Sequence, residues 1–482
     1  MRNVIPSIAL LSLVPATLGA PAPIAAPEAT AAPPLHATAA LEERQLLGGL
    51  LGGVNGVLNG LLGDINRAVA AKDPTAVNSA LVKVKPVSRP TNIADAVARA
   101  SQIWASPTGR TDFYPAVASQ IAAGLGPLLD GTLNTALTGG LPVGENSIDN
   151  DNPPPPTEIY PFKQTSDAPY TLSESALRKA IFIPSGFSYG EGQKRPVIMV
   201  PGTGSYGGAT FANNLRKLLT GSDFADPVWL NIPGAMLGDA QTNSEYIAYA
   251  INYISSVSNN NQDIAVISWS QGGLDTQWVL KYWPSTRDVV KDFLPVSPDF
   301  KGTILANVLC LSANSDLGLN PCPPSVVQQE ATSDYIGRLR DDGGDSAYVP
   351  TTTFYSGFFD EVVEPMQGTI ASAFINDARG IGVSNNEVQR VCAGQLGGSF
   401  YGHAGVLFNP LTYALIVDAL RNDGPGSTSR IDVKSVCSSY AASGLDLDDI
   451  IATSGLIPIA AVLLLSYPDR RLTEPALRAY AV

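Results

Sequence analysis

The sequence predicts an α/β fold with a mostly parallel central sheet, preceded by a small α-helical region. Apolar, strand-like runs recur in the later part of the chain, mostly separated by helical stretches such as "SEYIAYAINYISSVS". This alternation is typical of a parallel sheet buried on both faces. At 482 residues the chain can build one large core and an accessory region. The predicted strands are "RPVIMVPG", "PVWLNIPG", "DIAVISW", "DFLPVSPD" and "VPTTTFYSG".

The N-terminus has the pattern of a secretory signal over residues 1–20. One arginine is followed by an apolar stretch and then by small residues, and we expect cleavage near Ala20. Residues 21–44 form an Ala/Pro/Thr-rich, pro-like segment that is too low in complexity to pack. We therefore expect a secreted, extracellular protein, in which disulfides can form.

Residues 45–145 are expected to form the helical region. Apolar residues stand at helical spacing there, weakened by glycines at the start, and Thr91 or Asn92 can cap the helix of "TNIADAVARASQIWA". A Pro-rich linker follows at 146–160, and the α/β domain is expected at 161–482. The apolar faces of the helices predict either packing against the body or a cover that restrains activity at a pocket entrance. Packing is favoured, because a separate core with this much glycine would be marginal.

Charge and composition exclude several partners. A formal net charge of −13 and a pI near 4.7 argue against binding to nucleic acid or to anionic membranes. "GLIPIAAVLLLSY" is apolar but too short for a transmembrane anchor. The four cysteines lack the CxxC spacing of a zinc site, so we predict neither a metal nor another cofactor.

The segment "VPGTGSYGG" imitates a nucleotide-binding motif. Gly202, Gly204 and Gly207 satisfy GxGxxG, but a dinucleotide site also needs an acidic residue at the end of the next strand. That strand runs into "LNIPGAML" without one, so we predict no nucleotide site. The glycines instead let backbone N–H groups approach a ligand closely.

The segment "SWSQGG" predicts a nucleophile at a sharp strand-to-helix turn. Ser270 follows the apolar run "DIAVIS" and precedes the helical "LDTQWVLKYW". A nucleophile elbow normally reads GxSxG, because the turn leaves no room for large neighbours. Here Ser268 replaces the first glycine and Gly272 keeps the second.

Only two histidines are available to activate this serine. His36 lies in the low-complexity segment, whereas His403 lies in the glycine-flanked "SFYGHAGVLF", late in the chain. The acid is expected between Ser270 and His403 at a strand end, where Asp299 and Asp360 are the candidates. In α/β-hydrolases the acid commonly follows the second strand after the elbow, which favours Asp360. Its neighbour Glu361 is then expected to form a salt bridge without taking part in catalysis.

These motifs resemble a known family. The elbow, "VPGTG", "SPDFKGT", "VPTTTFYSGFFDEVVEP" and "HAG" are similar to the Candida antarctica lipase B family of fungal lipases, from about Pro161 to the end. The resemblance implies an α/β-hydrolase fold, hydrolysis of carboxylic esters including triacylglycerols, and a lipid or ester substrate. The helical region has no counterpart in the mature family member.

The resemblance also implies roles for individual residues. Ser270, Asp360 and His403 match the triad, and Thr203 and Gln271 match the oxyanion donors. Trp269 matches the residue at the floor of the alcohol pocket, although the same tryptophan could simply be part of the hydrophobic core. Asp299 and Gln329 match buried polar residues on the acyl side. Cys392 and Cys437 match one family disulfide. Cys310 and Cys322 have no family equivalent and are close together in the sequence, so a crosslink there is expected to stiffen the segment at the entrance and narrow the range of substrates.

Two other functions remain open on the sequence alone. An acyltransferase or amidase uses the same triad, because water and other nucleophiles attack the same acyl-enzyme. A hydrolase-fold protein that binds lipid without catalysis is the other alternative, which the complete triad disfavours. Acyl preference, natural substrate and oligomeric state do not follow from the sequence.

Overall fold

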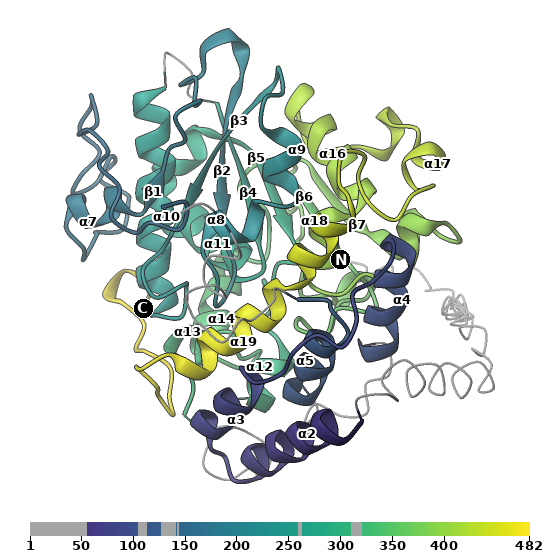
Figure 1. Cartoon of the computed structure of the whole chain (residues 1–482). Coiled ribbons are helices and arrows are strands. Elements are labelled where there is room, and N and C mark those ends of the chain that lie inside the picture. Colours follow the sequence, from purple (N-terminus) through teal and green to yellow (C-terminus); the bar gives the residue numbers. More distant parts are fainter. Residues whose placement is uncertain (1–54, 105–112, 127–140, 142–143, 259–262, 310–320) are drawn as a thin grey trace, which may run out of the picture. The chain divides into compact units, whose positions relative to one another are not determined.

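The central sheet has seven strands in the order β1-β3-β2-β4-β5-β6-β7 (Figure 1). The computed structural model describes residues 55–104, 113–126, 141, 144–258, 263–309 and 321–482. β1 is antiparallel to β3, and the other neighbouring strands are parallel. The five predicted strands are β2 to β6, and the predicted α/β fold is confirmed. The strands are β1 (Ile181–Phe182), β2 (Arg195–Val200), β3 (Ala225–Leu230), β4 (Ile264–Trp269), β5 (Val290–Val296), β6 (Thr351–Tyr355) and β7 (Val383–Glu387).

Helices cover both faces of the sheet, so its strands are apolar on both sides. Successive β2 residues alternate between two hydrophobic clusters, as the period of a strand requires. Ile198 packs with α10, α11 and α14, whereas Val197 belongs to the cluster that holds α9 and α16. These helices are α9 (Leu215–Leu219), α10 (Ala240–Val257), α11 (Gln271–Tyr282), α14 (Asp334–Arg340) and α16 (Pro410–Arg421).

Shorter helices lie in the segments that connect the strands and the longer helices. They are α7 (Glu174–Lys179), α8 (Gly207–Phe211), α12 (Ile304–Leu309), α13 (Pro324–Gln328), α15 (Val388–Val391) and α17 (Val433–Val436). Two helices near the C-terminus, α18 (Leu447–Ser454) and α19 (Leu456–Ser466), run one after the other across the face drawn in Figure 1.

The N-terminal helices pack on the body. They are α2 (Asn55–Ala70), α3 (Pro74–Leu81), α4 (Ile93–Trp104) and α5 (Phe113–Ala122), and Figure 1 shows α3 and α5 beside α19. Asn92 caps α4, because its Oδ1 accepts a hydrogen bond from the Asp95 N–H at 2.9 Å. Buried α5 residues belong to the same cluster as α19 residues. A hydrogen bond also joins α5 to α18, because Gln120 Nε2 donates to the Ser454 carbonyl at 2.7 Å.

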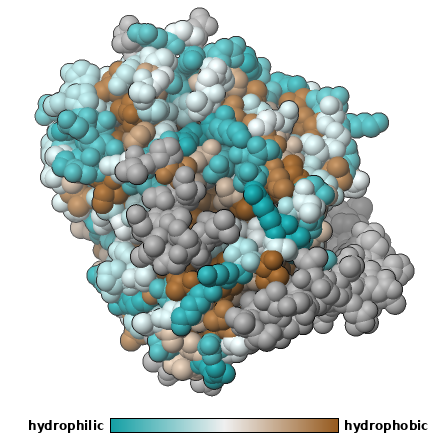
Figure 2. All heavy atoms as spheres, in the orientation of Figure 1, coloured by the Kyte–Doolittle hydropathy of each residue, from teal (hydrophilic) through white to brown (hydrophobic). Residues whose placement is uncertain are grey.

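α18 and α19 form an apolar stretch from Leu447 to Ser466. By length and composition this stretch could cross a membrane, but 72% of its most apolar window is buried inside the protein. Figure 2 shows hydrophobic side chains where α19 lies in Figure 1. Most of these side chains contact the N-terminal helices and the body, so α18 and α19 are buried in the way that core helices are.

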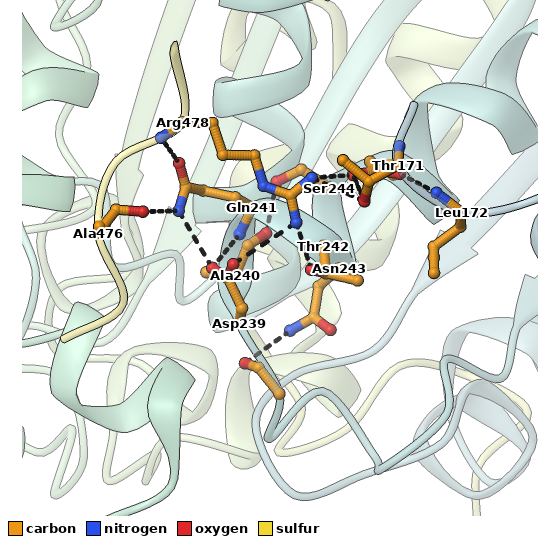
Figure 3. Close-up of polar contacts among 12 residues, drawn as sticks. Thr171, Leu172, Asp239, Ala240, Gln241, Thr242, Asn243, Ser244, Ala476 and Arg478 are labelled. Atoms are coloured by element: carbon orange, nitrogen blue, oxygen red, sulfur yellow. Dashed lines mark hydrogen bonds and ion pairs between the residues drawn. The ribbon is translucent and has the colours of Figure 1, made fainter. Parts of the chain in front are cut away.

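The C-terminal segment is held by a cluster of polar contacts (Figure 3). Arg478 donates to Thr171 Oγ1 at 2.8 Å and to Thr242 Oγ1 at 2.6 Å, and it pairs with the fully buried Glu245. Gln241 Nε2 donates to the Ala476 carbonyl at 3.1 Å. A buried carboxylate needs such a partner, so Arg478 fastens the end of the chain to the start of α10.

Candidate active site

Ser270 stands at a strained turn between β4 and α11. Its backbone has φ 55° and ψ −130°, a conformation that is costly for a residue other than glycine. The neighbouring loop leaves no room for side chains, since a Cβ on Gly202 would lie 2.8 Å from Ser270 Cβ, and one on Gly272 would lie 2.4 Å from the Pro201 carbonyl oxygen. This crowding and positive φ are the geometry of a nucleophile elbow.

His403 lies close to Asp360, both fully or nearly buried. The two Asp360 carboxylate oxygens are 2.9 and 3.0 Å from His403 Nδ1. Asp360 Oδ1 also accepts hydrogen bonds from the N–H groups of Val362 and Val363. The carboxylate therefore favours the tautomer with the proton on Nδ1 and leaves the lone pair on Nε2, which bonds to no residue that the structure describes.

The pKa of His403 reflects both its burial and its neighbours. Burial lowers the pKa, but the negative charges of Asp360, Glu361 and Asp299 outweigh it and raise the pKa above its ordinary value. Glu361 forms no salt bridge with any residue that the structure describes, although the sequence suggested one. Its Oε2 accepts a hydrogen bond from the His403 backbone N–H at 2.8 Å and so holds the histidine loop. Nothing in the sequence marked that role except its place beside Asp360.

Asp299 is fully buried, and neither of its carboxylate oxygens bonds to a described residue. Burial, together with the charge of Asp360, raises the pKa of this carboxyl to about 7. Asp299 follows β5 whereas Asp360 follows β6, and Asp360 is the carboxylate that contacts the imidazole.

A cavity of about 70 Å³ joins the candidate residues. Thr203, Trp269, Ser270, Gln329 and His403 line it. Its wall is otherwise mainly apolar, as expected of a site for an acyl or alkyl group. The apolar wall includes Phe113, Leu305, Leu309, Val326, Ile457 and Leu464. Phe113 comes from α5, so the N-terminal helices contribute to the cavity wall as well as packing on the body, where the sequence left packing and a cover at the pocket entrance as alternatives.

Two donors face the region beside Ser270. Gln271 is the first residue of α11, so its backbone N–H has no acceptor within the helix, and the positive end of the helix dipole lies there. Thr203 lies on the loop after β2, and its Oγ1 is 2.8 Å from Gln271 Oε1 and 2.9 Å from Gln329 Oε1.

Trp269 has two roles in the geometry of the site. Its ring centroid lies 5.1 Å from that of His403, and its Nε1 donates to the His403 carbonyl at 3.3 Å. Trp269 thus lines the cavity and also positions the histidine loop.

One disulfide joins Cys392 to Cys437, with a Cα–Cα distance of 5.4 Å. This is the pair that the family resemblance implies. Cys322 is also disulfide-bonded, and its expected partner, Cys310, lies outside the described residues. Within the part of the chain that the structure describes, no group of three or more His, Cys, Asp or Glu side chains could hold a metal ion.

Comparison with known proteins adds to this geometry. No family model matches the chain. Lipase B of Pseudozyma antarctica is 34% identical over 287 residues, which cover 60% of this chain and 79% of that protein. The crystal structure of Aspergillus fumigatus lipase B is 45% identical, with a TM-score of 0.77, over 88% of this chain and 99% of that one.

The Aspergillus fumigatus structure also bears on the N-terminal region. Residues 161–482 make up about two thirds of the chain, so a match over 88% extends into the N-terminal region. The helices ahead of the sheet are therefore not confined to this chain, although the resemblance gave them no counterpart. The sequence identity and the coverage show that the chain belongs to the lipase B family.

Proposed function

We propose that the chain is a secreted serine lipase and carboxylesterase that hydrolyses acylglycerols and other carboxylic esters through an acyl-enzyme. The observation that supports it most is the arrangement around one cavity. Ser270, at a strained turn, and His403, held at Nδ1 by Asp360, line the same apolar pocket. A serine becomes a nucleophile when a base takes its proton, and this base is oriented by a third group.

In the proposed reaction, Ser270 Oγ attacks the ester carbonyl carbon while His403 Nε2 takes the hydroxyl proton. The imidazolium is stabilised by the Asp360 carboxylate at Nδ1. The oxyanion is stabilised by the Gln271 backbone N–H and by Thr203. The intermediate then expels the alcohol, which leaves with the proton from His403. Water attacks the acyl-enzyme in the same way and releases the acid.

The pocket residues have proposed parts in substrate binding. Trp269 forms the floor on the alcohol side, and Gln329 lies in the cavity wall on the acyl side. Asp299 is assigned to the acyl side as well, and the raised pKa of its buried carboxyl keeps part of it uncharged near neutral pH. An uncharged acid beside an apolar acyl pocket avoids repelling the oxyanion.

The proposed domain boundaries are those expected from the sequence. Residues 1–20 are a signal peptide and 21–44 a pro-like segment, both outside the described residues. The helical region is 45–145, and its described helices, α2 to α5, share a hydrophobic cluster with α18 and α19. The linker is 146–160, and the catalytic domain is 161–482.

The test is the Ser270→Ala variant with a p-nitrophenyl ester. We expect it to fold as the wild type does and to lose turnover, since the attacking oxygen is gone. Retained turnover in the folded variant would refute the proposed mechanism. A serine-reactive phosphonate separates an enzyme from a lipid-binding protein, because a binder without a nucleophile is not labelled. Product analysis with an added alcohol separates hydrolysis from acyl transfer.

A further inference from the structure

A buried carboxyl lies behind the proposed oxyanion hole and has no part in the reaction described above. Asp275 is in the first turns of α11, four residues after Gln271, and is fully buried. Its carboxyl accepts two hydrogen bonds. Gln271 Nε2 donates to Oδ2 at 3.1 Å, and Tyr335 Oη donates to Oδ1 at 3.1 Å.

Asp275 determines which end of the Gln271 amide faces the cavity. The amide nitrogen only donates and the amide oxygen only accepts, so Nε2 turns to the carboxyl and Oε1 turns away from it. Gln271 Oε1 then accepts from Gln329 Nε2 at 3.1 Å and from Thr203 Oγ1 at 2.8 Å. Gln329 Nε2 also donates to the Ser325 carbonyl at 3.0 Å, so Gln329 presents its oxygen to Thr203 at 2.9 Å.

This arrangement fixes the role of the Thr203 hydroxyl. Two amide oxygens surround it, and neither can donate, so Thr203 must be the donor and its single proton is shared between them. A negatively charged oxygen in the cavity would draw that proton away, because hydrogen bonds to charged acceptors are about twice as strong as neutral ones. Gln271 Oε1 would still accept from Gln329 Nε2, so the change leaves that buried oxygen satisfied.

We propose that Asp275 is a positioning residue that orients the Gln271 side chain and, through it, holds the Thr203 hydroxyl as a donor to the acyl oxyanion. This inference rests on the proposed function. With the amide reversed, Gln271 Nε2 would face Thr203, whose oxygen would become the acceptor, and it would also face the NH₂ group of Gln329.

The role of Asp275 does not need a negative charge. Burial, together with the charges of Asp299 and Asp239, raises the pKa of Asp275 well above its ordinary value. A protonated carboxyl can donate to Tyr335 and still offer one carbonyl oxygen to Gln271. The amide of asparagine has the same two functions, so asparagine should replace Asp275, whereas leucine should not.

The first measurement is kcat and KM of Asp275→Leu and Asp275→Asn on a p-nitrophenyl ester. For Asp275→Leu we expect kcat to fall at least ~10-fold, a part of the ~100- to 1,000-fold cost of deleting an oxyanion donor, with KM little changed. For Asp275→Asn we expect most of kcat to be retained. Equal losses in both variants, or a loss confined to KM, would overturn the proposal.

The second measurement is a double-mutant cycle with Gln271→Met, which keeps the backbone N–H and removes the side-chain amide. If Asp275 acts through that amide, Gln271→Met lowers kcat as Asp275→Leu does, and the double variant is no worse than either. Tyr335→Phe is the matched control. It removes the other hydrogen bond to Asp275 and leaves the one that orients the Gln271 amide, so kcat should stay close to the wild-type value.

The proposal can still be tested if Asp275→Leu does not fold. Wild-type kcat in folded Gln271→Met would by itself overturn the proposal. Failure of the proposed function is seen separately, as retained turnover in Ser270→Ala. A protein in which Ser270→Ala is inactive and Gln271→Met is fully active has the proposed triad without the proposed positioning.

Discussion

Two buried aspartates lie near His403, and their contacts separate them. Asp360 touches Nδ1 with both oxygens, whereas Asp299 bonds to no described residue. We predict that Asp360→Asn lowers turnover by about 10⁴-fold, because the wrong tautomer is favoured and the imidazolium loses its partner. Asp299→Asn keeps the shape of an uncharged acid and should cost far less. Turnover of both variants on one soluble ester checks this, and the reverse order of losses would assign the acid to β5.

Glu361 gives a second prediction, for the pH dependence. Burial and the charge of Asp360 raise the pKa of Glu361 to about 7, so part of this carboxyl is charged near neutral pH. That charge contributes to raising the pKa of His403, and the base must be neutral to accept a proton. Turnover therefore falls as pH drops through the raised pKa. Glu361→Gln removes the charge while its amide oxygen can still accept from the His403 N–H. The acidic limb of kcat/KM should move to lower pH. An acidic limb that moves to higher pH would contradict the assigned charge effect.

Among single residues, the sequence predicted those for which the chain offers no alternative candidate. Ser270 was marked by its turn, and His403 was the one histidine outside the low-complexity segment. The function of Glu361 and Asp275 could not be predicted in this way. Each depends on one hydrogen bond made after folding, and Asp275 acts with Thr203 and Gln329, which lie far from it in the sequence.

Among the elements, the close approach of the start of α11 to the end of β2 holds the turn at Ser270 in place. A Cβ on Gly272 would lie 2.4 and 2.7 Å from the carbonyl oxygens of Pro201 and Val200, and backbone atoms cannot yield cheaply. We predict that Gly272→Ala pushes α11 away from β2 and lowers both turnover and the free energy of unfolding. Gly337→Ala in α14 is the matched control, since nothing lies within 4 Å of its added Cβ. It should stabilise the protein by about 0.4–1 kcal/mol. Thermal unfolding and ester turnover measure both, and an unaffected Gly272→Ala would contradict the packing argument.

Strand prediction succeeded where burial on both faces leaves a continuous apolar run. β2 to β5 carry such a run, and β6, which reads "TTTFY", is buried throughout and ends in two aromatic residues. Each of these five strands was predicted. The edge strands were missed for physical reasons. β1 is only two residues long, and β7 reads "VSNNE", whose polar side chains give no apolar period.

For the whole molecule, the N-terminal helices show both what the sequence predicted and what it could not. Their apolar faces predicted packing on the body, and they share one hydrophobic cluster with α18 and α19. That Phe113 itself lines the cavity could not be predicted, because this contact joins segments far apart in the chain. The helices therefore contribute both to the core and to the wall of the candidate site.

This shared core predicts the outcome of removing the helices. Ile121 and Val117 of α5 are fully buried, and Ile457 and Leu465 of α19 are nearly so, all in one cluster. Each such side chain contributes about 1.5–3 kcal/mol when it leaves water, so residues 151–482 alone should unfold at a lower temperature than the full chain and aggregate. Arg89→Ala is the control in the full chain, because it breaks only the exposed ion pair with Asp448, which should be worth at most ~1 kcal/mol. Thermal unfolding, light scattering and turnover of a soluble ester are measured for the three proteins. Equal stability and equal turnover of the short and full chains would mean that the helices neither complete the core nor shape the site.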